Sequence, residues 1–290
     1  MSMFVRLGDA SVDAPVLVMG MEGWIDAGLG AGAAMATLID QVPNQLIGRF
    51  DTDLLLDQRA RRPVLRIVDG VTSPLKWPEI ELRAGVDRAG KSVLLLVGPE
   101  PDMRWKSFTS TVVGLATEMG VRMAVGLGAF PAPVPHTRPT RLASTATSAD
   151  LAVQVGFVPG TIDVPAGIHA ALERGFADAG VPSVGLWARV PHYAAAMPYP
   201  AASAALIDGL ASVAGLTLHA GDLQAAAAVT SQRIDELIAN SEEHTEMVRQ
   251  LEMQIDAVED EAAAGFDIGN LPSGDEIAAE LERFLRGERG

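Results

Sequence analysis

Short apolar runs alternate with helical patterns over the first 220 residues, and this alternation constrains the fold more than any other feature of the chain. Two runs, VLLLVG and MAVGLG, are almost continuously apolar, which suits central strands that are buried on both faces. IELRAGV and PVLRIV alternate partially, which favours antiparallel or edge strands. Strands separated by crossover helices predict an α/β protein. We expect strands at 15–20, 46–51, 64–69, 80–86, 92–98, 121–127, 141–147 and 183–188, and helices at 24–40, 105–119, 165–179 and 200–214.

The sequence changes character after residue 221. Residues 225–264 lack Gly and Pro and carry a seven-residue apolar repeat, which predicts one long amphipathic helix with a polar interruption at Ser241 and His244. Another helix is predicted near the C-terminus, with Ile277, Leu281, Phe284 and Leu285 on one face. We therefore divide the chain into an α/β body, 1–221, and a helical region, 222–290, that packs on the body or on a neighbouring subunit.

Charge and composition argue against several kinds of partner. The net charge is −15, and residues 222–290 alone hold 17 acidic and 5 basic side chains. Nucleic acids and anionic membranes attract basic surfaces, so neither is expected as a partner. No apolar run approaches the roughly 18 residues of a membrane span, and the first residues lack the layout of a signal peptide. The chain has no Cys, which removes disulfides and thiol chemistry. We expect a cytoplasmic protein.

The stretch MGMEGWIDAGLGAGAAM contains the Gly-x-Gly-x-x-Ala spacing of a dinucleotide-binding turn, starting at Gly28. In such turns the first glycine follows the strand directly, so that the pyrophosphate meets the N-terminus of the next helix. Here the strand ends near Gly20, and seven residues intervene. Glu22 and Asp26 would also place negative charge where the pyrophosphate should bind. We interpret the glycines as small residues of a packing helix, and we expect no cofactor.

Glu22 and Asp26 flank Trp24 and form the first candidate site. A carboxylate pair can hold a metal ion or perform acid–base chemistry. The alternative is structural, because a carboxylate in the first turn of a helix stabilises that helix. We favour the structural interpretation, and no spacing of histidines and carboxylates along the chain predicts a metal site.

Arg104 and Trp105 form a second candidate, in the segment PEPDMRWKSF after the strand expected at 92–98. Acidic and basic side chains surround the indole there. The segment is a pocket rim, a ligand clamp or a helix cap, and the cap is the default interpretation.

Two Pro-rich loops supply the remaining candidates. AFPAPVPHTRPTR carries His136 and Arg138, and VPHYAAAMPYP carries His192 and Tyr193. Proline forbids a helix in these segments and favours extended, exposed loops. Both loops follow expected core strands, and ligands usually bind at the carboxyl ends of the strands in open α/β sheets. The histidines are candidate general bases, or else caps or interface residues.

Several of these motifs together resemble the proteasome assembly chaperone 2 family. The motifs are VLVMGMEGWIDAG, VLLLVGPEPDMRWKSF, GLGAFPAPVPHTRPTRLASTATS, LWARVPHYAAAMPYPAASAAL and, near the C-terminus, LPSGDEIAAELERFL. The resemblance implies a three-layer αβα body with a mixed sheet, similar to purine nucleoside phosphorylases. It also implies self-association, with a trimer as the guess from this architecture. Eukaryotic and archaeal relatives act as chaperones that assemble the proteasome core.

Two functions from different classes follow. The first is a non-enzymatic assembly or scaffold protein that works through protein–protein contacts, with proteasome subunits as possible partners. The second is a nucleoside- or phosphate-type binding protein or enzyme, whose pocket is lined by the turn at 22–26 and by the two Pro-rich loops. The chain has no G-x-S-x-G, P-loop or H-E-x-x-H motif, so we lean away from an enzyme.

Overall fold

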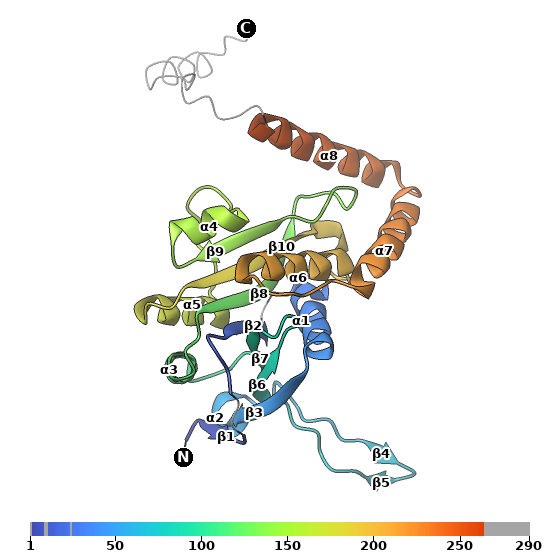
Figure 1. Ribbon diagram of the computed structural model, residues 1–290. Coiled ribbons are helices and arrows are strands. Elements are labelled where there is room, and N and C mark those ends of the chain that lie inside the picture. The colour runs from blue at the N-terminus through green and yellow to red at the C-terminus, as the bar shows by residue number, and fades with distance from the viewer. Residues whose placement is uncertain (1, 9–10, 24, 264–290) are drawn as a thin grey trace.

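The computed structural model describes residues 2–8, 11–23 and 25–263, and side chains as far as residue 257 (Figure 1). Its centre is an eight-stranded mixed sheet with the order β1-β3-β6-β7-β2-β8-β10-β9. The strands are β1 (Phe4–Arg6), β2 (Val16–Glu22), β3 (Asn44–Phe50), β6 (Ile80–Val86), β7 (Ser92–Pro99), β8 (Met123–Ala132), β9 (Leu142–Ala146) and β10 (Ser183–Pro191). The helices are α1 (Gly30–Gln41), α2 (Thr52–Leu55), α3 (Trp105–Glu118), α4 (Ala149–Val155), α5 (Ile168–Asp178), α6 (Pro200–Ala214), α7 (Asp222–Ile238) and α8 (Glu242–Ala263).

The middle of the sheet is parallel and its flanks are antiparallel. Strands β7, β2, β8 and β10 run parallel to one another, whereas β6 pairs antiparallel with both β3 and β7. The continuous apolar runs are confirmed as central strands, since they form β7 and β8. The alternating run IELRAGV is confirmed as an antiparallel strand, β6.

Helices cover both faces of the sheet and make three layers. Along β2, Val16 and Val18 point into the core beneath α1 and α6, whereas Leu17 and Met19 point into the core beneath α3 and α5. Burying each such side chain contributes about 1.5–3 kcal/mol. The expected α/β class with a mixed, helix-flanked sheet is confirmed. The likeness to purine nucleoside phosphorylases stays a prediction. No helix in the described part of the chain is long and apolar enough to cross a bilayer.

The glycines after β2 let α1 approach its neighbours closely. A Cβ atom at Gly30 would lie 2.9 Å from the Cβ of Ala129 on β8 and 3.0 Å from the Cβ of Ala202 on α6. Gly28 has a φ of 64°, and a Cβ there would lie 2.6 Å from the Cβ of Tyr199. These contacts agree with the interpretation of the segment as a packing helix.

The prediction of a strand at 64–69 in the large sheet is wrong. Residues 62–77 instead form an arm that projects from the body (Figure 1) and carries the short hairpin β4 (Ile67–Val68) and β5 (Val71–Thr72). Asp69 and Gly70 both have positive φ, 50° and 82°, and turn the chain back after two residues of strand. The apolar run therefore pairs with its own continuation and never joins the large sheet.

The prediction of a single helix at 225–264 is also wrong, because α7 ends at Ile238 and a separate helix, α8, starts at Glu242. Ser241 precedes α8, and its Oγ accepts a hydrogen bond from the backbone N of His244 at 3.3 Å. The polar interruption is therefore a helix start. Ile234 of α7 is buried in the body core, whereas Leu237 is 59% exposed. The helix expected around 277–285 lies outside the described residues.

Two helical glycines provide a matched test of the close packing of α1. Gly30→Ala places a methyl group against Ala129 and Ala202, and we expect it to destabilise the fold by about 1–3 kcal/mol. Gly114→Ala lies in the interior of α3 with no atom within 4 Å of the new Cβ, and we expect stabilisation by about 0.4–1 kcal/mol. Urea unfolding of both variants measures the two effects. Equal effects in the two variants would contradict the packing argument.

Candidate functional site

Asp26 binds the N-terminus of α1. Its Oδ1 accepts from the backbone N of Ala31 at 2.8 Å, and its Oδ2 accepts from the N of Gly32 at 2.9 Å. These N–H groups lie in the first turn and have no partner within the helix, so the carboxylate stabilises it. They are also the donors that a bound phosphate would use. The side chain of Asp26 therefore occupies the anion position of the dinucleotide interpretation.

Glu22 ends β2 and is exposed, and its carbonyl oxygen accepts from the backbone N of Glu100 at 2.9 Å. The Oε2 of Glu100 in turn accepts from the N of Ile168, the first residue of α5, at 3.0 Å. Adjacent strands β2 and β7 send their next helices, α1 and α3, to opposite faces of the sheet, and such a switch point is where open α/β sheets usually bind ligands. At this switch point the carboxylate of Glu100 binds the start of α5. Trp24 lies outside the described residues.

Arg104 and Trp105 stand at the start of α3. Arg104 is exposed, with a φ of 60°, and the indole N–H of Trp105 donates to the carbonyl of Pro101. Next to them, Asp102 accepts from the backbone N of Asp57 at 2.8 Å and pairs with Arg61 at 3.2 Å. These contacts secure the start of α3 and the base of the arm. They do not include any residue of the two Pro-rich loops.

His136, Tyr193 and Asp235 form a hydrogen-bonded chain that joins both Pro-rich loops to α7. The backbone N of His136 donates to the hydroxyl of Tyr193 at 2.8 Å, so the hydroxyl proton is left to donate to His136 Nδ1, also at 2.8 Å. This arrangement places the ring proton on Nε2, which lies 2.9 Å from Asp235 Oδ1. Burial raises the pKa of Tyr193 to about 12, so the phenol stays protonated as a donor.

Arg138 attaches the same loop to α8. Its Nε and one terminal nitrogen donate to the two carboxylate oxygens of Asp256, at 2.8 and 2.7 Å, and its other terminal nitrogen lies 3.3 Å from Glu252. The hydroxyl of Thr137 donates to Glu252 as well. This ion pair lowers the pKa of Asp256, which keeps the carboxylate charged. We call the contacts of His136, Thr137 and Arg138 with α7 and α8 the loop–helix clamp.

The clamp corrects the expectation for one of the two loop histidines. The side chain of His136 is only 1% exposed, so the expectation that the loop displays it to solvent is wrong. His192 is exposed, and its ring lies edge-on to Tyr193 at 5.4 Å between centroids. The sequence analysis does not predict the acidic partners of the loops, Asp235, Glu252 and Asp256. Glu252 and Asp256 stand four residues apart, on one face of a helix, and that spacing is the signal that points to them.

A second titratable cluster lies beside α5, on the face of the sheet that α3 and α5 cover. His169 Nε2 accepts from the backbone N of Met21 at 3.3 Å, and burial lowers the pKa of His169 to about 4. Glu173 accepts from the hydroxyl of Thr145 at 2.8 Å. The hydroxyl oxygen of Thr145 in turn accepts from the indole N–H of Trp187 at 3.2 Å. Burial raises the pKa of Glu173. A neutral histidine in this place fits a core role.

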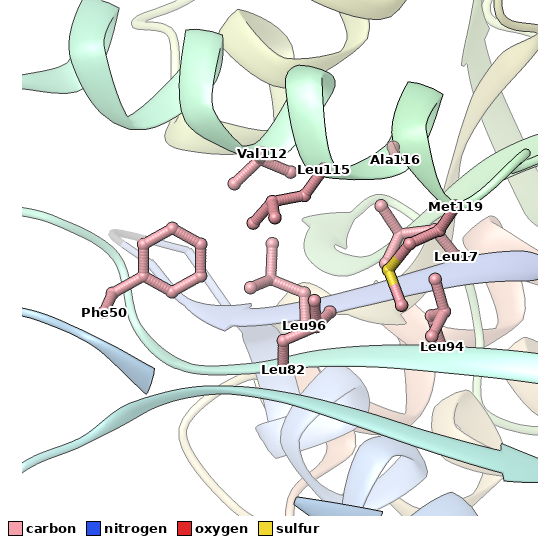
Figure 2. A pocket seen from close by; sticks show the side chains of 9 residues that line it. All are labelled: Leu17, Phe50, Leu82, Leu94, Leu96, Val112, Leu115, Ala116 and Met119. Atoms are coloured by element: carbon pink, nitrogen blue, oxygen red, sulfur yellow. The ribbon is translucent and has the colours of Figure 1, made fainter. Parts of the chain in front are cut away.

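Three of the cavities formed by the described residues are considered, and none of these three is lined by Glu22, Arg104, His136 or His192. A gap of about 10 Å³ lies among apolar side chains between the sheet and α3 (Figure 2), which is no larger than a single water molecule needs. A second, of about 20 Å³, lies between Ile255 of α8 and the side chains of Arg138, Arg141, Arg189 and Tyr199. The third, of about 370 Å³, is an open hollow beside the end of β6. Among the described residues, no three His, Asp or Glu side chains cluster so as to hold a metal ion.

Comparison with known proteins places this fold. Residues 20–238 match the sequence model of the PAC2 family. The chain belongs to the PAC2 family. This confirms the resemblance to the proteasome assembly chaperone 2 family seen in the motifs. A comparison with curated protein sequences gave no significant match.

Solved structures agree with this assignment. A protein of unknown function from Corynebacterium glutamicum is 32% identical with a TM-score of 0.83, over 88% of this chain and 97% of that one. A proteasome-assembly chaperone homologue from Mycobacterium tuberculosis is 36% identical with a TM-score of 0.75, over 80% and 99%. An archaeal homologue of proteasome-assembly chaperone from Pyrococcus furiosus is 16% identical with a TM-score of 0.57, over 85% and 97%, which shows a shared fold.

The clamp predicts that Arg138 holds α8 on the body. Arg138→Ala removes the donors to Asp256 and Glu252, and we expect amide hydrogen exchange in α8 to accelerate several-fold. Arg249→Ala is the matched control, because Arg249 pairs with Glu246 within α8 itself and its loss changes the charge equally. Equal exchange in the two variants would show that the clamp does not hold the helix.

The lowered pKa of His169 predicts that the folded protein loses stability in mild acid. Its folded pKa of about 4 lies below the ordinary 6.5, so the unfolded chain takes up a proton that the folded chain refuses. Stability that is complete above pH 6.5 is therefore lost as the pH falls towards 4, by up to roughly 3 kcal/mol. His169→Gln keeps an acceptor for Met21 and does not titrate. We expect urea unfolding at pH 7 and pH 4.5 to show a smaller loss in this variant, and parallel losses would contradict the assignment.

Proposed function

We propose that this PAC2 family member is a non-enzymatic, assembly-chaperone-like protein that acts through protein–protein contacts in the cytoplasm. Family membership, together with the 36% identical proteasome-assembly chaperone homologue, supports an assembly-factor-like role. We further propose that the chain self-associates, with a trimer as the first state to test, and that proteasome subunits are among its partners.

One observation carries the choice against an enzyme. At the carboxyl ends of the parallel strands, polar side chains of the kind that would contact a substrate bind parts of the protein instead. Asp26 and Glu100 hold the starts of two helices, and His136 and Arg138 hold α7 and α8. Groups committed to such contacts support a scaffold, because a catalytic group needs access to the reacting atoms.

The acidic helices α7 and α8 are the proposed contact region for a partner. Glu236 and Glu243 are exposed there, and residues 222–290 carry most of the net negative charge of the chain. We propose that the division into a body, 1–221, and a partner-binding region, 222–290, follows this charge. Electrostatic attraction to a basic surface would speed the encounter and select the partner.

A reconstitution experiment tests this function. Purified proteasome α- and β-subunits of the host are mixed with the full chain, and formation of the core particle is followed on native gels. We expect faster assembly, weakened several-fold by the double substitution E236Q/E243Q. The control D40N/D208N removes the same charge from exposed positions of α1 and α6, and we expect it to behave as wild type.

A second candidate function has one observation in its favour. Arg141 and Arg189 line the 20 Å³ cavity beneath α8, next to Arg138, which is bound to Asp256 and Glu252, and burial together with Arg141 lowers the pKa of Arg189. Such a cluster suits an anion of the phosphate type. If the subunits neither bind nor assemble faster, and phosphate or a nucleoside raises the Tm of the full chain, the small-molecule function replaces the chaperone-like one.

A further inference from the structure

The cluster beside α5 (Figure 1) contains a carboxylate without a basic partner among the described residues. Glu173 is half-buried on α5, and its Oε2 accepts from the hydroxyl of Thr145 at 2.8 Å. Burial raises the pKa of Glu173, and the groups that oppose this are the hydroxyl of Thr145 and the backbone of Gly185, neither of which is charged. Carboxylates away from water are usually paired with a cation, because their desolvation is costly. Glu173 is therefore suited to receive a positive group from outside the chain.

The hydrogen bonds of the cluster run towards this carboxylate. The indole N–H of Trp187 donates to the oxygen of Thr145 at 3.2 Å, which leaves the hydroxyl proton of Thr145 to donate to Glu173. Donors aligned in this way favour the charged form of the carboxylate. No hydrogen bond to the Oε1 of Glu173 is found in the part of the chain that the structure describes. This oxygen keeps its acceptor capacity for a ligand.

The indole of Trp187 lies flat on the sheet. A Cβ atom at Gly128 would clash with Cε3 of the indole, and one at Gly185 would lie 2.9 Å from Nε1. Cε3 and Nε1 stand on opposite long edges of the ring system, so one face of the indole covers both glycines and the other face points away from the sheet. Trp187 is partly exposed. The outer face of an indole attracts cations through its π electrons.

His169 stands at the side of this indole. Its ring lies edge-on to that of Trp187, with 6.5 Å between the centroids, and its Nε2 accepts from the backbone N of Met21. Burial lowers the pKa of His169 to about 4, so the ring is neutral near pH 7 and does not repel a cation. Aromatic rings next to a carboxylate are the groups with which proteins recognise organic cations.

We propose that Trp187 and Glu173 form a binding site for a guanidinium group. Thr145 contacts both side chains, so the carboxylate stands at the edge of the indole. A planar guanidinium stacks on the outer face of the indole and donates from its edge to the Oε1 of Glu173, which the compact ammonium of a lysine does less well. The net charge of −15 attracts such a ligand to the chain.

The ligand is the arginine side chain of a partner protein or a free guanidinium compound, since both present the same group. The site contains no residue of the loop–helix clamp and none of the acidic residues proposed above to contact a partner. The inference therefore goes beyond the proposed function and does not depend on it.

NMR titration of the full-length chain tests the site. The chain has four Trp, so ¹⁵N labelling gives four indole N–H signals, and the variant W187F identifies the signal of Trp187. The probe is the peptide acetyl-Ala-Arg-Ala-amide. We expect a saturable shift of the Trp187 signal. The same peptide with citrulline in place of arginine has nearly the same shape and no charge, and we expect it to leave the signal in place.

Two variants of α5 give a matched comparison. E173Q removes the charge and keeps an oxygen that accepts from Thr145, and we expect it to weaken binding of the arginine peptide about tenfold. D178N removes the same charge from an exposed residue of the same helix, which pairs with Arg174. We expect D178N to bind the peptide as wild type does.

The outcomes separate a guanidinium site from a merely structural cluster. Equal shifts with the arginine and citrulline peptides overturn the proposal, as does equal affinity of E173Q and wild type. A Trp187 signal that moves with neither the arginine peptide nor ethylguanidinium overturns it as well. Within a confirmed site, tighter binding of ethylguanidinium than of the peptide assigns a free ligand, and the reverse order assigns the side chain of a partner. None of these results depends on proteasome assembly.

Discussion

Burial of the central strands on both faces is the constraint on which the rest of this structure depends. Strands β7, β2 and β8 present apolar side chains to either side, so helices must cover both faces. The strands are parallel, so β2 and β7 are each followed by a crossover through a helix, whereas β8 is followed by the antiparallel strand β9. Layers, crossovers and the direction of the strand ends all follow from that requirement.

Crossover helices start near the carboxyl ends of the strands, and their free N–H groups need acceptors. In this chain the acceptors are carboxylates at those strand ends, Asp26 for α1 and Glu100 for α5. The same residue types at the same place would suit a catalytic or anion-binding site. In this structure both carboxylates are used as helix caps.

The C-terminal helices are joined to the body by polar contacts as much as by apolar ones. Ile234 buries its side chain in the core, while Asp235 beside it meets His136, and Asp256 meets Arg138. A buried histidine with both ring nitrogens bonded accepts only one arrangement of its neighbours. The clamp thus sets where α7 and α8 begin their path over the loops and leaves their outer, acidic faces towards solvent.

Local pattern was sufficient for some elements and insufficient for others. The continuous runs of β7 and β8, the alternation of β6 and the helix at α3 were predictable, because the burial of a segment shows directly in its periodicity. The arm is not predictable from its apolar content, because PVLRIV has the composition of a strand and only the Asp69-Gly70 turn shows that it pairs locally. The interruption between α7 and α8 is likewise marked in the sequence only by Ser241. A serine at that place fits a polar position inside one long helix as well as it fits the cap of a new helix.

The sequence by itself determined the fold class, the central strands, the packing role of the glycines before and in α1, and the family. These depend on residues close together in the chain or on motifs that stand intact within it. Only the tertiary structure decided what the candidate site residues do. His136 meets a partner 99 residues away, and Arg138 one that is 118 residues away. Contacts between such distant segments depend on how the loops and helices are placed in space, and no local pattern encodes that placement.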